Sequence, residues 1–203
     1  ESIRLGGDFK KALASIERLV RRGLPVEFVF VPLRPNLGQL LEAYDLASSL
    51  GARAFITGPA MRLGRAAADW EALAPSAQEW ESASKRLAEH AQGRGFPARL
   101  SVYPWDILRE MEVRLDSPQA MILVVPDGKV KLLNALPFAP ADLRRQTLPE
   151  AWTLYREAWA GGEVRDFIGA CRKDPGLLRH ANETWPMGEW SARRGAVEIR
   201  TGG

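Results

Sequence analysis

The fold of this chain is decided by the stretch VEFVFVPLRPNLGQLLEAYDLASSLGARAFITGPAMRLGRA, residues 26–66. Residues 26–32 are apolar except for one glutamate, which predicts a strand covered on both faces in a parallel sheet. A helix capped by Asn36 and ended by Gly51 should follow. A second strand is expected at residues 53–57. A strand, a helix and a strand in this order predict a βαβ unit, in which the loops that leave the strands carry the function.

The residues before this stretch predict an amphipathic helix over residues 8–22, with Asp8 as its N-cap and Gly23 at its C-terminal cap. Two or three parallel strands cannot close a barrel, and so narrow an open sheet leaves an unpaired edge where a neighbouring strand belongs. We therefore expect the sheet to continue in residues outside this chain, which would make the chain part of a larger protein.

The pattern changes near residue 70, and we place a domain boundary there, between residues 1–70 and 71–203. Ser76 and Glu79 form a capping-box signature for a helix that runs to about residue 92. A short strand is expected near residues 98–103.

Later in this part, Asp127-Gly128 between two apolar runs predicts an antiparallel hairpin. Thr147 and Glu150 form a second capping box, which opens a helix whose aromatic stripe we interpret as core. Another helix is expected over residues 163–172 and a strand at residues 196–200.

Composition excludes several classes of function. The chain has 203 residues and no apolar run of the length that a membrane span requires, which predicts a cytoplasmic protein without a membrane partner. Its net charge of +3 is spread among acidic residues, so we expect no nucleic-acid partner. The single cysteine, Cys171, is interpreted as a half-buried structural thiol, and with only two histidines the chain lacks the ligands for a metal site.

The candidate site lies at the carboxyl ends of the two strands in the opening stretch. Arg34 can hold a carboxylate there, although without further information a surface side chain held by the helix behind it is the favoured interpretation. Asn36 is primarily a helix cap. Gly58 either lets a flat ring approach the backbone or simply belongs to an ordinary loop. Gly64-Arg65-Ala66 gives a weaker indication of an anion contact. No pattern identifies a catalytic residue. The candidate cofactor-binding residues are Arg34, Asn36, Thr57, Gly58, Pro59 and Arg65.

Several of these motifs, taken in order, resemble the later half of the radical SAM enzymes, in particular the SPASM-type group of peptide and cofactor maturases. The resemblance covers roughly residues 4–66 and 119–160. The motifs that carry it are VFVPLRPN at 29–36, PAMRLGRA at 59–66, VVPDGKV at 124–130 and QTLPEAW at 146–152.

The resemblance implies an α/β fold: the C-terminal part of a partial (β/α)6 barrel followed by a small α+β extension with an antiparallel hairpin. It implies that Arg34 and Asn36 end the fifth barrel strand, near the methionine or ribose part of S-adenosylmethionine. Residues 55–59 would end the sixth strand, near the adenine. The whole protein would also hold a [4Fe–4S] cluster and act on a peptide or small-molecule precursor.

The departures from the family pattern concern the clusters. The CxxxCxxC motif has no counterpart here, so the cluster ligands would lie outside this chain, in the N-terminal half of the barrel. Between Val130 and Pro137, where relatives carry a cysteine, this chain has KLLNAL, and we expect no auxiliary cluster. Two alternatives stay open. One is a cluster-free binding protein that completes a cysteine-bearing subunit, and the other is an unrelated (β/α) barrel enzyme.

Overall fold

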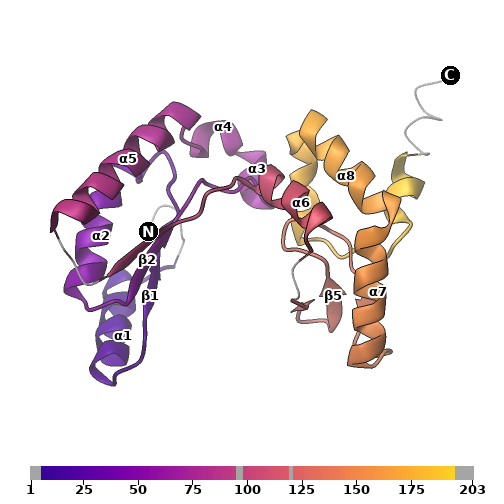
Figure 1. The fold of residues 1–203 in the computed structure, drawn as a ribbon, viewed down its shortest axis with the longest axis horizontal. Helices are drawn as coiled ribbons and strands as arrows, with labels where there is room; N and C mark the ends of the chain where they lie inside the picture. The colour runs from indigo at the N-terminus through magenta and orange to yellow at the C-terminus, as the bar shows by residue number, and fades with distance from the viewer. Residues whose placement is uncertain (1–5, 95–97, 119–120, 195–203) are drawn as a thin grey trace. The chain divides into compact units, whose positions relative to one another are not determined.

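The computed structural model describes residues 6–94, 98–118 and 121–194. Within these residues the chain forms two compact units, which we describe separately (Figure 1). The first unit has a parallel three-stranded sheet with helices, and the second has a small antiparallel three-stranded sheet with helices. The fold is therefore mixed α/β, and the described residues do not close a barrel. The described residues of the first unit are 6–60, 71–94 and 98–104, and those of the second are 61–70, 105–118 and 121–194.

The first sheet consists of three parallel strands in the order β1-β2-β3, which confirms the predicted parallel arrangement. The strands are β1 (Glu27–Val29), β2 (Ala54–Thr57) and β3 (Arg99–Val102). Phe28 of β1 lies opposite Phe55 of β2, which in turn lies opposite Leu100 of β3. The strand expected near residues 98–103 thus belongs to this sheet, so the units divide the chain differently from the boundary expected at residue 70.

One face of this sheet is covered by the helices α2 (Leu40–Ser49) and α5 (Ala77–Arg94), which lie side by side (Figure 1). Phe28 and Phe55 point to this face, where their rings stack with centroids 5.8 Å apart. Tyr44 of α2 meets the edge of Phe55, and Leu87 of α5 is fully buried in the same cluster. These side chains form the core of the first unit.

On β1, the face opposite these helices and the outer edge of the strand remain open among the described residues, whereas Ala54 of β2 is buried on that same face of the sheet. Val29 is 64% exposed and Val31 is 55% exposed, so the expectation of a strand covered on both faces is wrong for the described chain. The apolar run marks a strand that could be covered twice, but the partners for its second face do not lie in the described residues.

The helix α1 (Phe9–Arg21) starts and ends as predicted, but it is poorly packed. The Asp8 side chain accepts a hydrogen bond from the Lys11 N–H at 3.0 Å, and Gly23, with φ of +72°, follows its end. None of its residues is buried, and Phe9 at its start is 55% exposed. Leu13, Ile16 and Val20 are only half-buried, so the apolar face of the helix is covered in part.

The capping box that predicted α5 is confirmed. The Glu79 carboxylate accepts the Ser76 N–H at 2.7 Å, and the Ser76 hydroxyl accepts the Glu79 N–H at 3.2 Å. Two backbone donors at the helix start are satisfied in this way.

The second unit contains the predicted hairpin. The turn at Asp127-Gly128 connects β4 (Leu123–Val124) to β5 (Lys129–Lys131), and β6 (Ala141–Asp142) pairs antiparallel with β5. Gly128 has φ of +82°, a conformation that side-chain-bearing residues rarely adopt.

The helices of the second unit pack around this small sheet and share one core. The predicted capping box at Thr147 and Glu150 lies at the start of α7 (Leu148–Ala160). Tyr155 and Trp159 of this helix are buried in the core, as expected. Cys171 is fully buried in the same core, rather than half-buried. The helical elements are α3 (Arg65–Ala68), α6 (Ile107–Asp116), α7 (Leu148–Ala160), α8 (Gly162–Lys173) and η2 (Pro175–Asn182).

Across the described residues, no helix has the length and apolarity needed to cross a membrane. The strand expected at residues 196–200 lies outside the described residues.

Candidate functional site

The predicted site lies on the loops that leave the carboxyl ends of β1 and β2. The first loop is held by Asn36, whose Oδ1 accepts the Leu33 N–H at 2.7 Å and whose Nδ2 donates to the Val31 carbonyl at 3.1 Å. The side chain makes no cap hydrogen bond to the following 3-10 helix, η1 (Leu37–Gln39). Asn36 therefore stands at the N-cap position, as predicted, but the prediction that its side chain caps the helix is wrong. The asparagine instead closes its own loop, because its side chain reaches backward along the chain.

Arg34 is fixed to a neighbouring segment of the first unit. Its N–H donates to the carbonyl of Leu73 at 2.8 Å, and its Nη2 donates to the carbonyl of Ala74 at 2.9 Å. Leu73 is the last residue of the short helix α4 (Trp70–Leu73), so the arginine contacts the carbonyl end of that helix. The structure thus agrees with one of the two interpretations that the sequence left open, in which a helix holds Arg34. The residue is nevertheless exposed, so part of the guanidinium can still meet a ligand.

Charge at this loop also affects a nearby carboxylate. The pKa of Glu79 is lowered, chiefly because the carboxylate accepts the Ser76 backbone N–H, with further contributions from the Ser76 hydroxyl and from the charge of Arg34. Glu79 is therefore ionised and serves the start of α5.

Thr57 and Gly58, at the end of β2, are occupied by contacts within the unit. The Thr57 hydroxyl donates to the Phe30 carbonyl at 2.9 Å, and the Thr57 carbonyl accepts the Tyr103 N–H at 2.7 Å. A Cβ built on Gly58 would lie 2.7 Å from the Tyr103 Cβ, closer than such atoms approach in real structures. The glycine thus admits the chain that leaves β3. A tyrosine from this unit lies where the sequence led us to expect a flat ring of a ligand.

The structure brings together most, but not all, of the predicted site residues. The loops that carry Arg34, Asn36, Thr57, Gly58 and Pro59 leave neighbouring parallel strands at the same edge. Arg65 belongs to the second unit, where it is exposed at the start of α3.

The part of the chain that the structure describes offers neither a cluster of metal ligands nor a reactive thiol. No group of three or more histidine, cysteine, aspartate or glutamate side chains there could hold a metal ion. Burial raises the pKa of Cys171 to about 12, and the charge of Asp174 adds to this effect. The thiol is therefore protonated and inert near neutral pH.

Lys131 is an unusual residue that the sequence did not indicate. Its side chain is only 4% exposed, and its amine donates to the Ala181 carbonyl in η2. Burial lowers the pKa of Lys131 from 10.5 to about 8. The lysine ties the small sheet to η2, and the only signal in the sequence is its place in a short strand beside Lys129.

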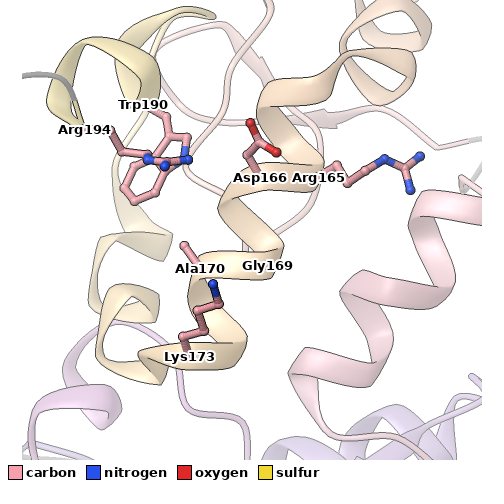
Figure 2. Close-up of a pocket in the computed structure, with 7 residues that line it drawn as sticks. All are labelled: Arg165, Asp166, Gly169, Ala170, Lys173, Trp190 and Arg194. Carbon is pink, nitrogen blue, oxygen red and sulfur yellow. The ribbon is translucent and has the colours of Figure 1, made fainter.

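A second feature missed by sequence reasoning is a cavity of about 440 Å³ in the second unit. It lies between α8 and the last helical turn, residues 189–194, as the side chains in Figure 2 show. Three basic side chains, one carboxylate and one indole line it. The available signal was the spacing of Arg165, Gly169 and Lys173, which places them on one face of a helix. The lining residues are Arg165, Asp166, Gly169, Ala170, Lys173, Trp190 and Arg194.

The chain matches no protein-family model, and the search of curated proteins finds no match to it either. The functional argument therefore depends on the residues and their geometry.

Proposed function

We propose that this chain supplies the later βα units and the C-terminal extension of a radical SAM enzyme, one that modifies a peptide or a cofactor precursor. One observation carries the proposal: the parallel sheet has helices on one face, while the other face of β1 and the outer edge of this strand are open. The wall of a (β/α) barrel has this arrangement, because helices cover its outer face and further strands continue at each edge.

The exposed apolar residues support this arrangement. Phe30 N–H donates to the Ile56 carbonyl, so the backbone groups of the alternate residue Val29 face the outer edge of β1. A further parallel strand could pair there, and the helix before it could cover α1. The motifs at residues 29–36 and 59–66 and the hairpin at Asp127-Gly128 fit the same interpretation.

The residues present fit the proposed cofactors only in part. Arg34 is exposed at the carboxyl edge and can contact a carboxylate such as that of S-adenosylmethionine. The hydroxyl of Thr57 and the space above Gly58 are already used inside the unit, so we assign these residues the task of holding the loops in place. Cys171 is buried and cannot anchor a cluster.

When bound in the whole protein, the cluster and S-adenosylmethionine would supply the radical chemistry by reductive cleavage. This chain would position its loops: Asn36 closes the first loop, Thr57 ties the end of β2 to β1, and Arg34 presents its guanidinium at the edge of the sheet.

A second candidate function is a cluster-free protein that completes a cysteine-bearing subunit. The open β1 edge and the partly covered apolar face of α1 favour it as well, because a separate chain could cover them as readily as an earlier part of the same chain. Stable co-purification of this chain with a cysteine-bearing partner would support this second candidate over the first.

The first proposal is tested by anaerobic reconstitution of the full-length gene product with iron and sulfide, followed by an assay for 5′-deoxyadenosine. Substitution Arg34→Ala should raise the KM for S-adenosylmethionine about tenfold, which corresponds to about 1.4 kcal/mol. The matched control is Arg53→Ala, because Arg53 is exposed at the opposite edge, where it pairs with Glu27 at 2.9 Å. No product with several reductants, or equal effects of the two substitutions, would count against the proposal.

A further inference from the structure

The cavity beside α8 has a local architecture that fixes its walls. One wall is α8 itself, and the other is the turn at residues 189–194. Glu163, in the first turn of α8, accepts backbone N–H groups from Gly188 at 2.7 Å and from Trp190 at 3.0 Å. The carboxylate therefore caps the start of the last helical turn and holds it against α8. This contact places Trp190 and Arg194 in the wall of the cavity.

The charges around the cavity are unbalanced. Three cations, Arg165, Lys173 and Arg194, accompany a single carboxylate, Asp166. Figure 2 shows Arg194 beside Trp190 on one side of α8, with the Lys173 amine directed along the helix. The Arg165 guanidinium points to the other side of the helix, so we treat it as the rim. Lys173 and Arg194 are the cations best placed to meet one ligand.

The indole of Trp190, which lines the same cavity, carries a neutral hydrogen-bond donor. Its ring is packed edge-on against Phe167, with centroids 5.1 Å apart, and its Nε1 is buried without a hydrogen-bond partner among the described residues. A buried donor that lacks an acceptor is uncommon and costs free energy, so such a group calls for an explanation. Of the side chains with such an atom in the described chain, Trp190 is the one that lines this cavity.

The floor of the cavity leaves room for a ligand. Gly169 lies in the middle of α8, and a Cβ built on it would meet nothing within 4 Å. Glycine weakens a helix interior relative to alanine, so nothing in the packing of α8 requires it at this position. The volume of about 440 Å³ falls within the usual range for small-molecule sites.

We propose that this cavity binds a small anionic molecule that carries phosphate or carboxylate groups. Lys173 and Arg194 contact the anionic groups, the Trp190 Nε1 donates to one of their oxygens, and Asp166 limits the affinity by repulsion. This inference does not depend on the proposed radical SAM function, because none of the residues involved has a role in that proposal.

The test is a titration of the full 203-residue chain with inorganic pyrophosphate, and separately with citrate, followed by NMR of the tryptophan indole N–H groups. The Trp190→Phe variant assigns the signal of Trp190. We expect saturable binding that moves the Trp190 indole signal, and the tighter of the two probes distinguishes a phosphate ligand from a carboxylate ligand. Exposed charges are screened by salt, so the affinity should fall at high ionic strength.

Removing a positive and a negative charge from the cavity should change the affinity for the probes in opposite directions. Lys173→Gln should weaken binding about three- to tenfold, and Asp166→Asn should strengthen it by a similar factor, because each removes one charge at the site. Gly169→Leu should block binding by filling the floor, whereas Gly169→Ala should leave the fold intact.

Arg156→Gln is the matched control, because Arg156 is an exposed arginine of α7 that does not line the cavity. The proposal is overturned if neither probe saturates, if Trp190 does not respond, or if Arg156→Gln weakens binding as much as Lys173→Gln.

Discussion

The Oε1 atom of Glu163 lies 3.0 Å from the backbone nitrogen of Trp190, 27 positions further along the chain. One side chain in the first turn of α8 therefore fixes the start of the last helical turn. We predict that Glu163→Ala releases that turn and lowers the free energy of unfolding by about 1–2 kcal/mol, as the loss of a helix cap does. The Trp190 indole signal should move even without ligand.

The matched control for this substitution is Glu157→Ala, because Glu157 is an exposed glutamate on α7. Urea unfolding and NMR of both variants check the prediction. An unchanged Trp190 signal in Glu163→Ala would show that other contacts hold the turn.

The close approach between Gly58 and Tyr103 gives a second prediction. Substitution Gly58→Ala places a methyl group 2.7 Å from the Tyr103 Cβ, so the loops after β2 and β3 must separate. Overpacking of this kind costs about 1–3 kcal/mol. Gly38→Ala is the control, since a Cβ there meets nothing within 4 Å. Chemical denaturation should show a loss of stability for Gly58→Ala alone, and equal stabilities would refute the packing argument.

The buried amine of Lys131 predicts a dependence of stability on pH. Its pKa in the folded chain is about 8, whereas an exposed lysine titrates near 10.5, so between these values the unfolded chain binds more protons. Stability should therefore rise with pH across this window, by about 1–3 kcal/mol. Lys131→Met should remove the rise.

Cys171 contributes a slope of the opposite sign above pH 9, because its pKa is raised in the folded chain. The informative quantity is therefore the difference in the free energy of unfolding between the wild-type chain and Lys131→Met. The contribution of Cys171 cancels in this difference. Thermal unfolding between pH 7 and pH 10 measures it, with Lys129→Met as the control on the same strand. A constant difference across this range would mean that the amine is not desolvated.

The open face of the first unit predicts self-association of the isolated chain. Val29 and Val31 present exposed apolar side chains on an unpaired strand, which is a template for pairing with another chain. The double substitution Val29→Lys and Val31→Lys should shift the chain toward monomer in sedimentation velocity. Leu148→Lys is the control, because Leu148 is equally exposed, at 59%, but lies at the start of α7. A wild-type chain that stays monomeric at high concentration would contradict the prediction.

Local sequence signals predicted most of the fold. Caps at Asp8 and at Ser76 with Glu79, and the Asp127-Gly128 turn, act through neighbours a few residues away, so the sequence alone could place α1, α5 and the hairpin. The membership of β3 in the first sheet could not be placed this way. It depends on pairing with β2 across more than forty residues, which a local pattern does not encode.

In the candidate site, too, the sequence did not reveal contacts between residues that are far apart in the chain. The sequence located the two loops at the carboxyl edge, but the partners of their side chains come from distant segments: Ala74 for Arg34 and Tyr103 for Gly58. Asn36 was misjudged because its side chain bonds backward to Leu33 rather than forward into the helix. The cavity beside α8 was missed because Trp190 reaches it through contacts with Glu163 and Phe167, which lie more than twenty positions earlier in the chain.

The most direct test of the central claim, that further strands complete the sheet at β1, is amide hydrogen exchange at Val29. The N–H of Phe30 is bonded to β2, whereas that of Val29 faces the open edge. In the full-length gene product, or in a complex with a cysteine-bearing partner, the account predicts that Val29 exchanges at least about 100-fold more slowly than in this chain alone, with a much smaller change at Phe30. Equal exchange of Val29 in both forms would contradict the account, because the sheet would then end at β1.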